Sequence, residues 1–366
     1  MGLLRLLLSL EVVLIHSGAG SIFGGRVVVQ LFYLFSGYVI ALVLSDRDRY
    51  DGAISFYFAR AIRLYPEYLL VAAITLPIVA FLPVPEHRPL LEVITGPLGP
   101  AVAISNITVI GQDWLMFIPG AHHGLLMPQT WALGIEASFY VLAPFALRSK
   151  RRIAILLLMS ICIRVALFVA GIGFQDPWTH RFFPAELAIF LLGAIVQRSI
   201  PAPLLPGTML AITLGCCALL VGASLFRLPE PVRSILIIGS FALAMPAIAK
   251  FDTVSAWSRT LGNLSYPLYL THIAALAVVE MLASKAHAPA IGVVASVAVA
   301  IVFFWFATPR LDAFRLRARQ WERARRLHSV GRHQLAEDTR QALSRNVVDF
   351  GDPGRDRSDE PLRDVA

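Results

Sequence analysis

Charged residues are scarce in this sequence. Only 15% of its 366 residues are Asp, Glu, Lys or Arg, whereas 57% are hydrophobic, and the mean hydropathy is +0.68. Soluble globular chains carry about 25% charged and about 45–50% apolar residues. The scarcity of charge therefore excludes an ordinary soluble domain. It indicates an all-α polytopic membrane protein, because so apolar a chain has to cross a bilayer several times.

Cysteine is nearly absent as well. Cys162, Cys216 and Cys217 lie in apolar runs, and no Cys-x-x-Cys or Cys/His ligand spacing occurs. The pattern suggests neither a disulfide framework nor a zinc site, so we expect no metal. The net charge of +8 comes from basic residues in a few short loops and in the C-terminal tail. The topology of a membrane protein explains that placement, and we expect no nucleic-acid partner.

Long apolar runs, by contrast, are frequent. A spanning helix needs about 20 mostly apolar residues. The runs predict ten spans, near residues 3–20, 27–45, 64–83, 130–147, 153–170, 184–199, 207–226, 233–250, 262–283 and 289–308. A further apolar run at 98–110 is ambiguous.

The charges of the loops orient these spans. Residues 46–63 and 148–152 are rich in arginine and are expected in the cytoplasm, whereas 111–129 has no Lys or Arg and is expected outside. Residues 98–110 then cannot make one full crossing, and we expect them to be re-entrant or packed on the outer side. Ten spans place both termini in the cytoplasm.

The chain is expected to have one large domain and a tail. Residues 1–310 contain all the predicted spans and form the transmembrane domain. Residues 311–366 begin strongly basic and then turn polar and mixed in charge, so they predict a cytoplasmic tail that is largely disordered.

The first apolar run, "LLRLLLSLEVVLIH", carries three ionisable residues. Arg5 and His16 are eleven residues apart, close to three helical turns, so they share one face about 16 Å apart along the axis. Taken alone, Arg5 is typical of an arginine whose side chain reaches the lipid headgroups on the cytoplasmic side. His16 alone is typical of a histidine satisfied within a protein core. The pair on one face favours a functional site. Glu11 lies about 140° from His16 around the helix, and the sequence assigns it no role.

Three further stretches combine apolar and reactive residues. In "QTWALGIEASFYVLAPF", Glu136 and Tyr140 are one turn apart, and Glu136 can be a proton acceptor, a ligand to a sugar hydroxyl or a partner for an arginine. In "LGNLSYPLYLTHIAAL", the residues Ser265, Tyr269 and His272 share a helical face. In "FYFARAIRLYPEYLL", two arginines three residues apart are either an ordinary basic flank or a site for a phosphate-rich donor; they are Arg60 and Arg63.

Together these stretches resemble the acyltransferase 3 family, the bacterial integral-membrane O-acyltransferases of cell-surface polysaccharides and related glycans. "RLLLSLEVVLIH" is similar to the Arg–ten residues–His signature of its first helix. Further resemblances, in chain order, are carried by "VVQLFYLFSGYVIALVL", "FARAIRLYPEYLL", "WALGIEASFYVLAP", "RFFPAELAIFLLGAIV" and "LGNLSYPLYLTHIAAL". They extend over most of residues 1–310.

The resemblance implies a function. It implies acyl-coenzyme A, most simply acetyl-CoA, as cytosolic donor, and as acceptor a hydroxyl of a cell-surface polysaccharide or lipid-linked glycan at the bacterial cytoplasmic membrane. It implies that His16 carries the central chemistry with Arg5 required beside it, and that Arg60 and Arg63 are candidates for donor binding. The other matching residues, candidates for substrate binding or support, are Trp131, Tyr140, Arg181, Ser265, Tyr269 and His272.

The sequence leaves several alternatives open. His16 either deprotonates the acceptor hydroxyl or carries the acyl group, and Glu136 orients either His16 or the acceptor. A transporter or export partner for a glycan or small polar molecule would also place polar residues on inner faces. A non-catalytic scaffold is the weakest alternative, because polar residues recur in four helices. The acceptor, the acyl length and the oligomeric state are also open.

Overall fold

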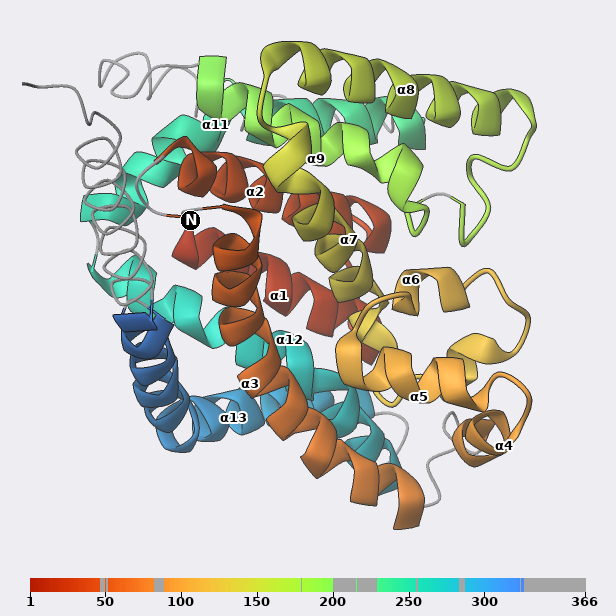
Figure 1. Ribbon diagram of the computed structural model, residues 1–366. Helices are drawn as coiled ribbons and strands as arrows, with labels where there is room; N and C mark the ends of the chain where they lie inside the picture. The colour runs from red at the N-terminus through yellow and green to blue at the C-terminus, as the bar shows by residue number, and fades with distance from the viewer. Residues whose placement is uncertain are drawn as a thin grey trace, which may run out of the picture. The chain divides into compact units, whose positions relative to one another are not determined.

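The computed structural model is helical through most of its described part (Figure 1). It describes residues 1–46, 50, 52–81, 89–178, 180–199, 215, 229–254, 256–282, 287–322 and 324–325. The chain divides into two compact units, Met1–Leu311 and Asp312–Ala366. Of the predicted tail, residues 311–322 and 324–325 are helical, and 326–366 lie outside the described residues.

The described part of the first unit contains nine longer helices. They are α1 (Gly2–Ser17), α2 (Gly25–Ser45), α3 (Ala53–Phe81), α7 (Trp131–Ala146), α8 (Lys150–Val169), α9 (Phe183–Ser199), α11 (Glu230–Val254), α12 (Ala256–Leu282) and α13 (Ala288–Phe306). Six of them, α2, α3, α8, α11, α12 and α13, are long and apolar enough to cross a membrane. The prediction of an all-α polytopic bundle is confirmed. The predicted span at 207–226 lies outside the described residues except for residue 215.

Burial follows the position of each helix in this unit (Figure 1). α2 is buried over 67% of its most apolar window, whereas α8 and α13 are buried over only 11% and 17%. The outward faces of α8 and α13 are apolar and suit contact with lipid. α2 therefore forms the centre of the bundle, and α8 and α13 its periphery.

The ambiguous run at 98–110 forms a short helix, α5 (Gly99–Thr108). Ten residues span about 15 Å, half of the hydrocarbon core, so α5 cannot cross it alone, as the loop charges predict. It packs with α4 (Pro89–Thr95), α6 (Gln112–Leu115) and η3 (Ala121–Gly124), and η4 (Pro128–Thr130) follows and contacts α7 and α12. Asn106 holds this segment together, since its amide donates to Gly124 O and accepts from Leu126 N, both at 2.8 Å.

α2 and α9 approach each other through glycine. A Cβ on Gly37 would lie 1.9 Å from Phe190 O, and one on Gly193 would lie 2.1 Å from Leu34 O. Small residues at such crossings let two membrane helices pack backbone against backbone. The two glycines therefore fix how closely α9 lies against the central helix.

α1 and α12 run parallel and in a constant register. A Cβ on Gly2 would lie 2.1 Å from the carbonyl oxygen of Ser258, so the two backbones touch there. Two turns later, Ser9 Oγ donates to Ser265 O at 3.1 Å. The numbering offset is 256 in both pairs. Seven residues make two turns, so the pairs recur on one seam as in a coiled coil. This seam runs along the whole of α1.

Glu11 closes the turn between α1 and α2. Its side chain is 3% exposed, and Oε1 accepts hydrogen bonds from Ser21 Oγ at 2.8 Å, Ile22 N at 2.5 Å and Phe23 N at 2.9 Å. Three donors compensate for burying a carboxylate. The residue to which the sequence assigns no role therefore fixes the loop that directly follows His16.

Replacing Gly37 by Ala is expected to separate α2 from α9 and to destabilise the protein by about 3 kcal/mol or more, because the new methyl meets backbone that cannot move aside. The thermal unfolding midpoint in detergent, followed by tryptophan fluorescence, measures this. Gly239→Ala on α11 is the matched control, since nothing lies within 4 Å of a Cβ there. Equal midpoints for the two variants would contradict the close crossing.

Replacing Glu11 by Ala is expected to lower stability by about 1–3 kcal/mol for each donor that loses its acceptor. Glu11→Gln keeps an acceptor oxygen and is expected to lie between Glu11→Ala and the wild type. The thermal unfolding midpoint and the rate of limited proteolysis in the 18–24 loop are measured for the wild type, Glu11→Gln and Glu11→Ala. A Glu11→Ala variant that melts and resists protease like the wild type would show that the loop does not depend on Glu11.

Candidate active site

Two histidines meet where the seam of α1 and α12 ends. His272 Nε2 lies 3.2 Å from His16 Nδ1, and the ring centroids are 5.1 Å apart. Their residue numbers again differ by 256, and each histidine follows the serine of the same helix, Ser9 or Ser265, by seven residues. His272 is fully buried, whereas His16 is exposed. The register thus sets a buried imidazole behind an accessible one.

The neighbouring carbonyls indicate where the protons lie. Carbonyl oxygens only accept, so His272 Nδ1, 2.8 Å from Tyr269 O, carries a hydrogen, and Nε2 of the neutral ring is an acceptor. His16 Nδ1 lies 3.0 Å from Val12 O and close to that acceptor, so it also carries a hydrogen. The lone pair of neutral His16 is then on Nε2. This is the arrangement of a base held in one tautomer by a second group.

Glu136 lies one layer away, on α7. Ser36 Oγ and Tyr140 OH both donate to its Oε1, each at 2.5 Å. The predicted contact between Glu136 and Tyr140 is therefore present, with Ser36 of α2 added. The described hydrogen-bond partners of Glu136 are hydroxyl groups, whereas His16 contacts the side chain of His272.

The two arginines of α3 lie near the far end of α7. Arg60 Nη2 is 3.4 Å from Tyr50 OH, its guanidinium lies 5.5 Å from the Phe56 ring centre, and its buried Nε has no partner among the described residues. Arg63 is exposed. Arg60, Arg63 and Glu136 all interact electrostatically with the Tyr140 hydroxyl. The predicted donor-binding pair and the predicted carboxylate are thus neighbours.

Tyr269 joins this group to the histidines. Its hydroxyl donates to Gln129 O and feels the charges of Glu136 and Arg181, and its ring lies 6.1 Å from that of His272. Polar side chains therefore follow one another from the arginines of α3 through Tyr140, Glu136 and Tyr269 to the histidine pair, and we call this row the polar path. Polar groups at membrane depth in such a row are typical of a substrate path.

The remaining predicted residues occupy different places. Ser265 lies on the seam, where its carbonyl accepts from Ser9. Trp131 begins α7, and the guanidinium of Arg181 stacks on it at 4.3 Å. Arg5 is half-buried on the His16 face of α1, about three turns before the histidine, and the structure does not bring it to the pair.

Two buried polar groups were missed by sequence reasoning. Glu186 of α9 is fully buried and accepts from Arg164 of α8 at 2.7 Å and from Gln30 of α2 at 3.1 and 3.2 Å. Asp113 of α6 is 1% exposed, and burial raises its pKa to about 6. Arg164 within the apolar run 153–170 was the available signal for the first group. For Asp113, the available signal in the sequence was its place in a loop, 111–129, that has no Lys or Arg.

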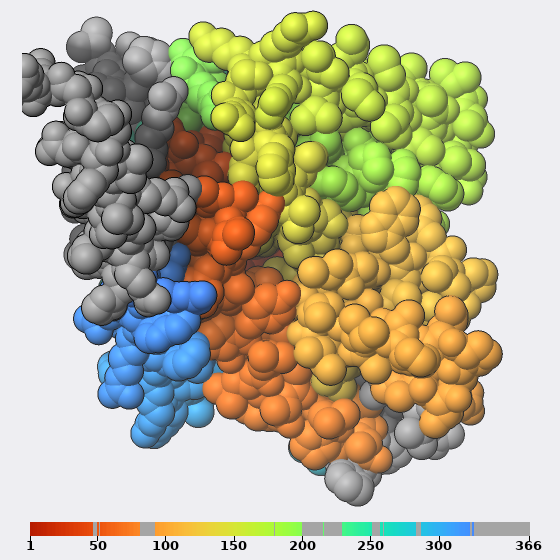
Figure 2. Space-filling model, viewed as in Figure 1, coloured from red at the N-terminus to blue at the C-terminus, as the bar shows by residue number. Residues whose placement is uncertain are grey.

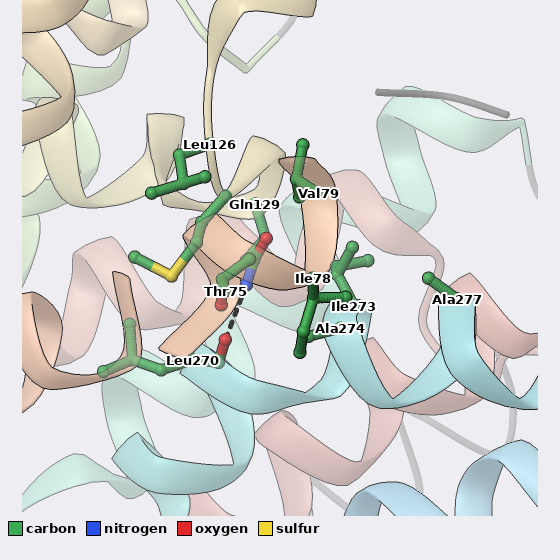
Figure 3. A pocket seen from close by; sticks show the side chains of 10 residues that line it. Thr75, Ile78, Val79, Leu126, Gln129, Leu270, Ile273, Ala274 and Ala277 are labelled. Atoms are coloured by element: carbon green, nitrogen blue, oxygen red, sulfur yellow. Dashed lines mark hydrogen bonds between the residues drawn. The ribbon is translucent and has the colours of Figure 1, made fainter. Parts of the chain in front are cut away.

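A small pocket lies on the other side of α12 (Figure 3). Leu270, Ile273, Ala274 and Ala277 line it from the face of α12 turned away from His272. Gln129 crosses it and donates to Leu270 O at 2.8 Å. The pocket is therefore separate from the histidine pair. Among the described residues, no group of three or more His, Cys, Asp or Glu could hold a metal ion.

Comparisons with known proteins agree with this arrangement. A family model described as an acyltransferase domain, acyltransferase 3, matches residues 1–308. Over 191 residues the chain is 26% identical to YrhL of Bacillus subtilis (strain 168), provisionally named a peptidoglycan O-acetyltransferase. The alignment covers 48% of this chain and 28% of that protein. No solved structure gives a significant match.

The family match extends over the first helical unit almost to its end and includes all the residues of the polar path and the histidine pair. The chain therefore belongs to the acyltransferase 3 family and is a membrane acyltransferase.

Proposed function

We propose that this protein is an O-acetyltransferase that moves an acetyl group from cytosolic acetyl-CoA to a hydroxyl of a cell-envelope glycan. The observation that carries the proposal is the histidine pair, in which His272 holds His16 as a base at Nε2. The family supports acyl transfer, and the resemblance to YrhL favours a glycan of the cell envelope, peptidoglycan among others.

In the proposed topology both termini are cytoplasmic in the bacterial inner membrane. The arginine-rich start of α3 then faces the cytosol, and the end of α1 with His16 lies toward the outer side. The donor binds with its phosphates at Arg60 and Arg63, because guanidinium groups match phosphate oxygens. Its thioester arm follows the polar path past Tyr140 and Glu136 toward the histidines.

The chemistry at His16 is a proton transfer coupled to attack. His16 Nε2 takes the proton of the acceptor hydroxyl while that oxygen bonds to the thioester carbonyl carbon. The C–S bond then breaks, and the leaving sulfur takes the proton from His16 Nε2 and departs as the free thiol. The transient imidazolium is stabilised because Nδ1–H keeps both Val12 O and His272 Nε2 as acceptors.

His16→Ala is expected to abolish transfer without unfolding the protein. Loss of a general base reduces rates by about 10²- to 10⁴-fold. The assay uses purified protein in proteoliposomes and measures release of the coenzyme A thiol in the presence of envelope glycan. His287→Ala, at a histidine outside the polar path, is the control and should keep the wild-type rate.

Two results would contradict the proposal. One is a His16→Ala protein that still acetylates glycan. The other is a wild-type protein that carries glycan across the bilayer without releasing thiol, which would make the chain a transporter.

His272 is expected to act through His16, and two amide variants test this. His272→Gln places an acceptor oxygen near the position of Nε2 and should retain a tenth or more of kcat. His272→Asn places its oxygen near Nδ1 and should fall about 10²-fold, within the range for a misplaced general base. KM for acetyl-CoA should stay unchanged in both, because the donor contacts are elsewhere. Equal losses in the two variants would show that the acceptor at Nε2 does not matter.

A further inference from the structure

Two segments that the mechanism does not use bring four aromatic rings together. α6 and the residues after it meet the segment before α9, and Figure 2 shows the two regions side by side on one face. Phe117 and Trp178 have ring centroids 4.8 Å apart, and Trp178 and Phe182 are 5.2 Å apart. Trp114 lies 5.8 Å from Phe182. We call Trp114, Phe117, Trp178 and Phe182 the ring cluster.

The ring cluster is not a closed core. The Trp114 side chain is 48% exposed, and the other three rings are partly exposed. Both segments lie outside the predicted spans. Large aromatic surfaces left in contact with solvent mark binding sites more often than structural cores.

Polar groups of the kind that bind hydroxyls adjoin the rings. Arg181, next to Phe182, stacks on Trp131 at 4.3 Å and pairs with Asp176 at 2.7 Å, so its guanidinium is held in one orientation. The His180 ring meets Trp131 edge-on at 5.3 Å, and burial together with Arg181 lowers the pKa of His180 to about 4. His180 is therefore neutral at physiological pH and adds no positive charge beside Arg181.

The Asp113 carboxylate accepts from the backbone N–H groups of Asp113 and Trp114, but one of its oxygens has no hydrogen-bond partner among the described residues. Its Oδ1 is buried without a hydrogen-bond partner, and it lies 3.1 Å from where a Cβ of Gly134 would stand. Asp113 and Arg181 both interact electrostatically with the hydroxyl of Tyr33, which donates to His180 O at 3.3 Å. An unpaired buried acceptor is costly and points to a donor that arrives with a ligand.

We propose that the ring cluster, Arg181 and Asp113 form the surface that binds sugar rings of the acceptor and presents a hydroxyl to His16. A sugar has an apolar C–H face that stacks on aromatic rings, and hydroxyls that pair with guanidinium and carboxylate groups. The surface is linked to the site electrostatically, because the charge of Arg181 acts on the Tyr269 hydroxyl and the Tyr269 ring lies 6.1 Å from that of His272. This inference rests on the proposed function and names where its acceptor binds.

The test measures how the rate of acetyl transfer depends on the amount of glycan, at a fixed and saturating concentration of acetyl-CoA. Full-length protein in proteoliposomes is given saturating acetyl-CoA and increasing masses of envelope glycan extracted from the source bacterium. Trp114→Ala and Trp178→Ala are expected to raise the glycan mass for half-maximal rate at least fivefold, with the maximal rate and the half-saturating acetyl-CoA concentration within about twofold of wild type. Trp114→Phe keeps a ring and should remain near wild type.

The controls separate binding of sugar from anchoring in the membrane. Trp305 on α13 is 71% exposed and far from the ring cluster in sequence, and Trp305→Ala should leave half-saturation by glycan unchanged. Thermal unfolding of each variant shows whether it is folded, and Asp113→Asn, which preserves side-chain volume, should also raise half-saturation by glycan.

Three results would count against this surface. Unchanged half-saturation in both Trp114→Ala and Trp178→Ala overturns it. Equal loss of thermal stability in these variants and in Trp305→Ala, with no change in half-saturation, assigns the rings to membrane anchoring and overturns it too. A wild-type protein that transfers no acetyl group to the extracted glycan overturns the proposed function itself, and this inference with it.

Discussion

The parallel seam between α1 and α12 is the constraint on which the site depends. Gly2 meets Ser258, Ser9 meets Ser265 and His16 meets His272, each at an offset of 256 and each seven residues after the last. Small residues at the first step let the backbones touch, and the later steps add polar contacts. A slip of one residue in register would turn His272 by about 100° away from His16 and remove the acceptor that fixes its tautomer.

Buried charge in this bundle falls into two kinds. Glu11 and Glu186 are each surrounded by several donors, so their burial is compensated, and they connect elements: a loop in the first case and three helices in the second. Glu136 is half-buried and accepts from two hydroxyls among the described residues, and Arg60 keeps a buried Nε without a described partner. Incomplete pairing costs free energy at membrane depth. Glu136 and Arg60 lie on the polar path, whereas Asp113, whose buried Oδ1 also has no partner among the described residues, lies outside it.

Features of the site could be predicted from the sequence where all the residues involved lie in one helix. The shared face of Arg5 and His16, the pair Glu136–Tyr140 and the class of the fold all follow from periodicity and composition, because each depends on residues within one helix or on the whole chain. The contact between His16 and His272 depends on how two helices far apart in sequence align, and no periodicity within either helix specifies that alignment. Glu11 shows the same limit, since its donors are backbone groups of a loop whose path is set by tertiary packing.

The acyl transfer that we propose, between two sides of a membrane, sets two opposing demands. A phosphate-rich donor requires cations at one end of the protein, and a sugar hydroxyl requires a base that is accessible at the other end. A single group cannot meet both, because the ends are separated by about the length of a membrane helix. This chain meets them with separate helices: α3 carries the arginines, and α1 carries His16 at its last turn. α7 and α12 supply the polar groups between them, so in the proposed mechanism the donor's flexible arm crosses the distance while the protein's reactive groups stay in place.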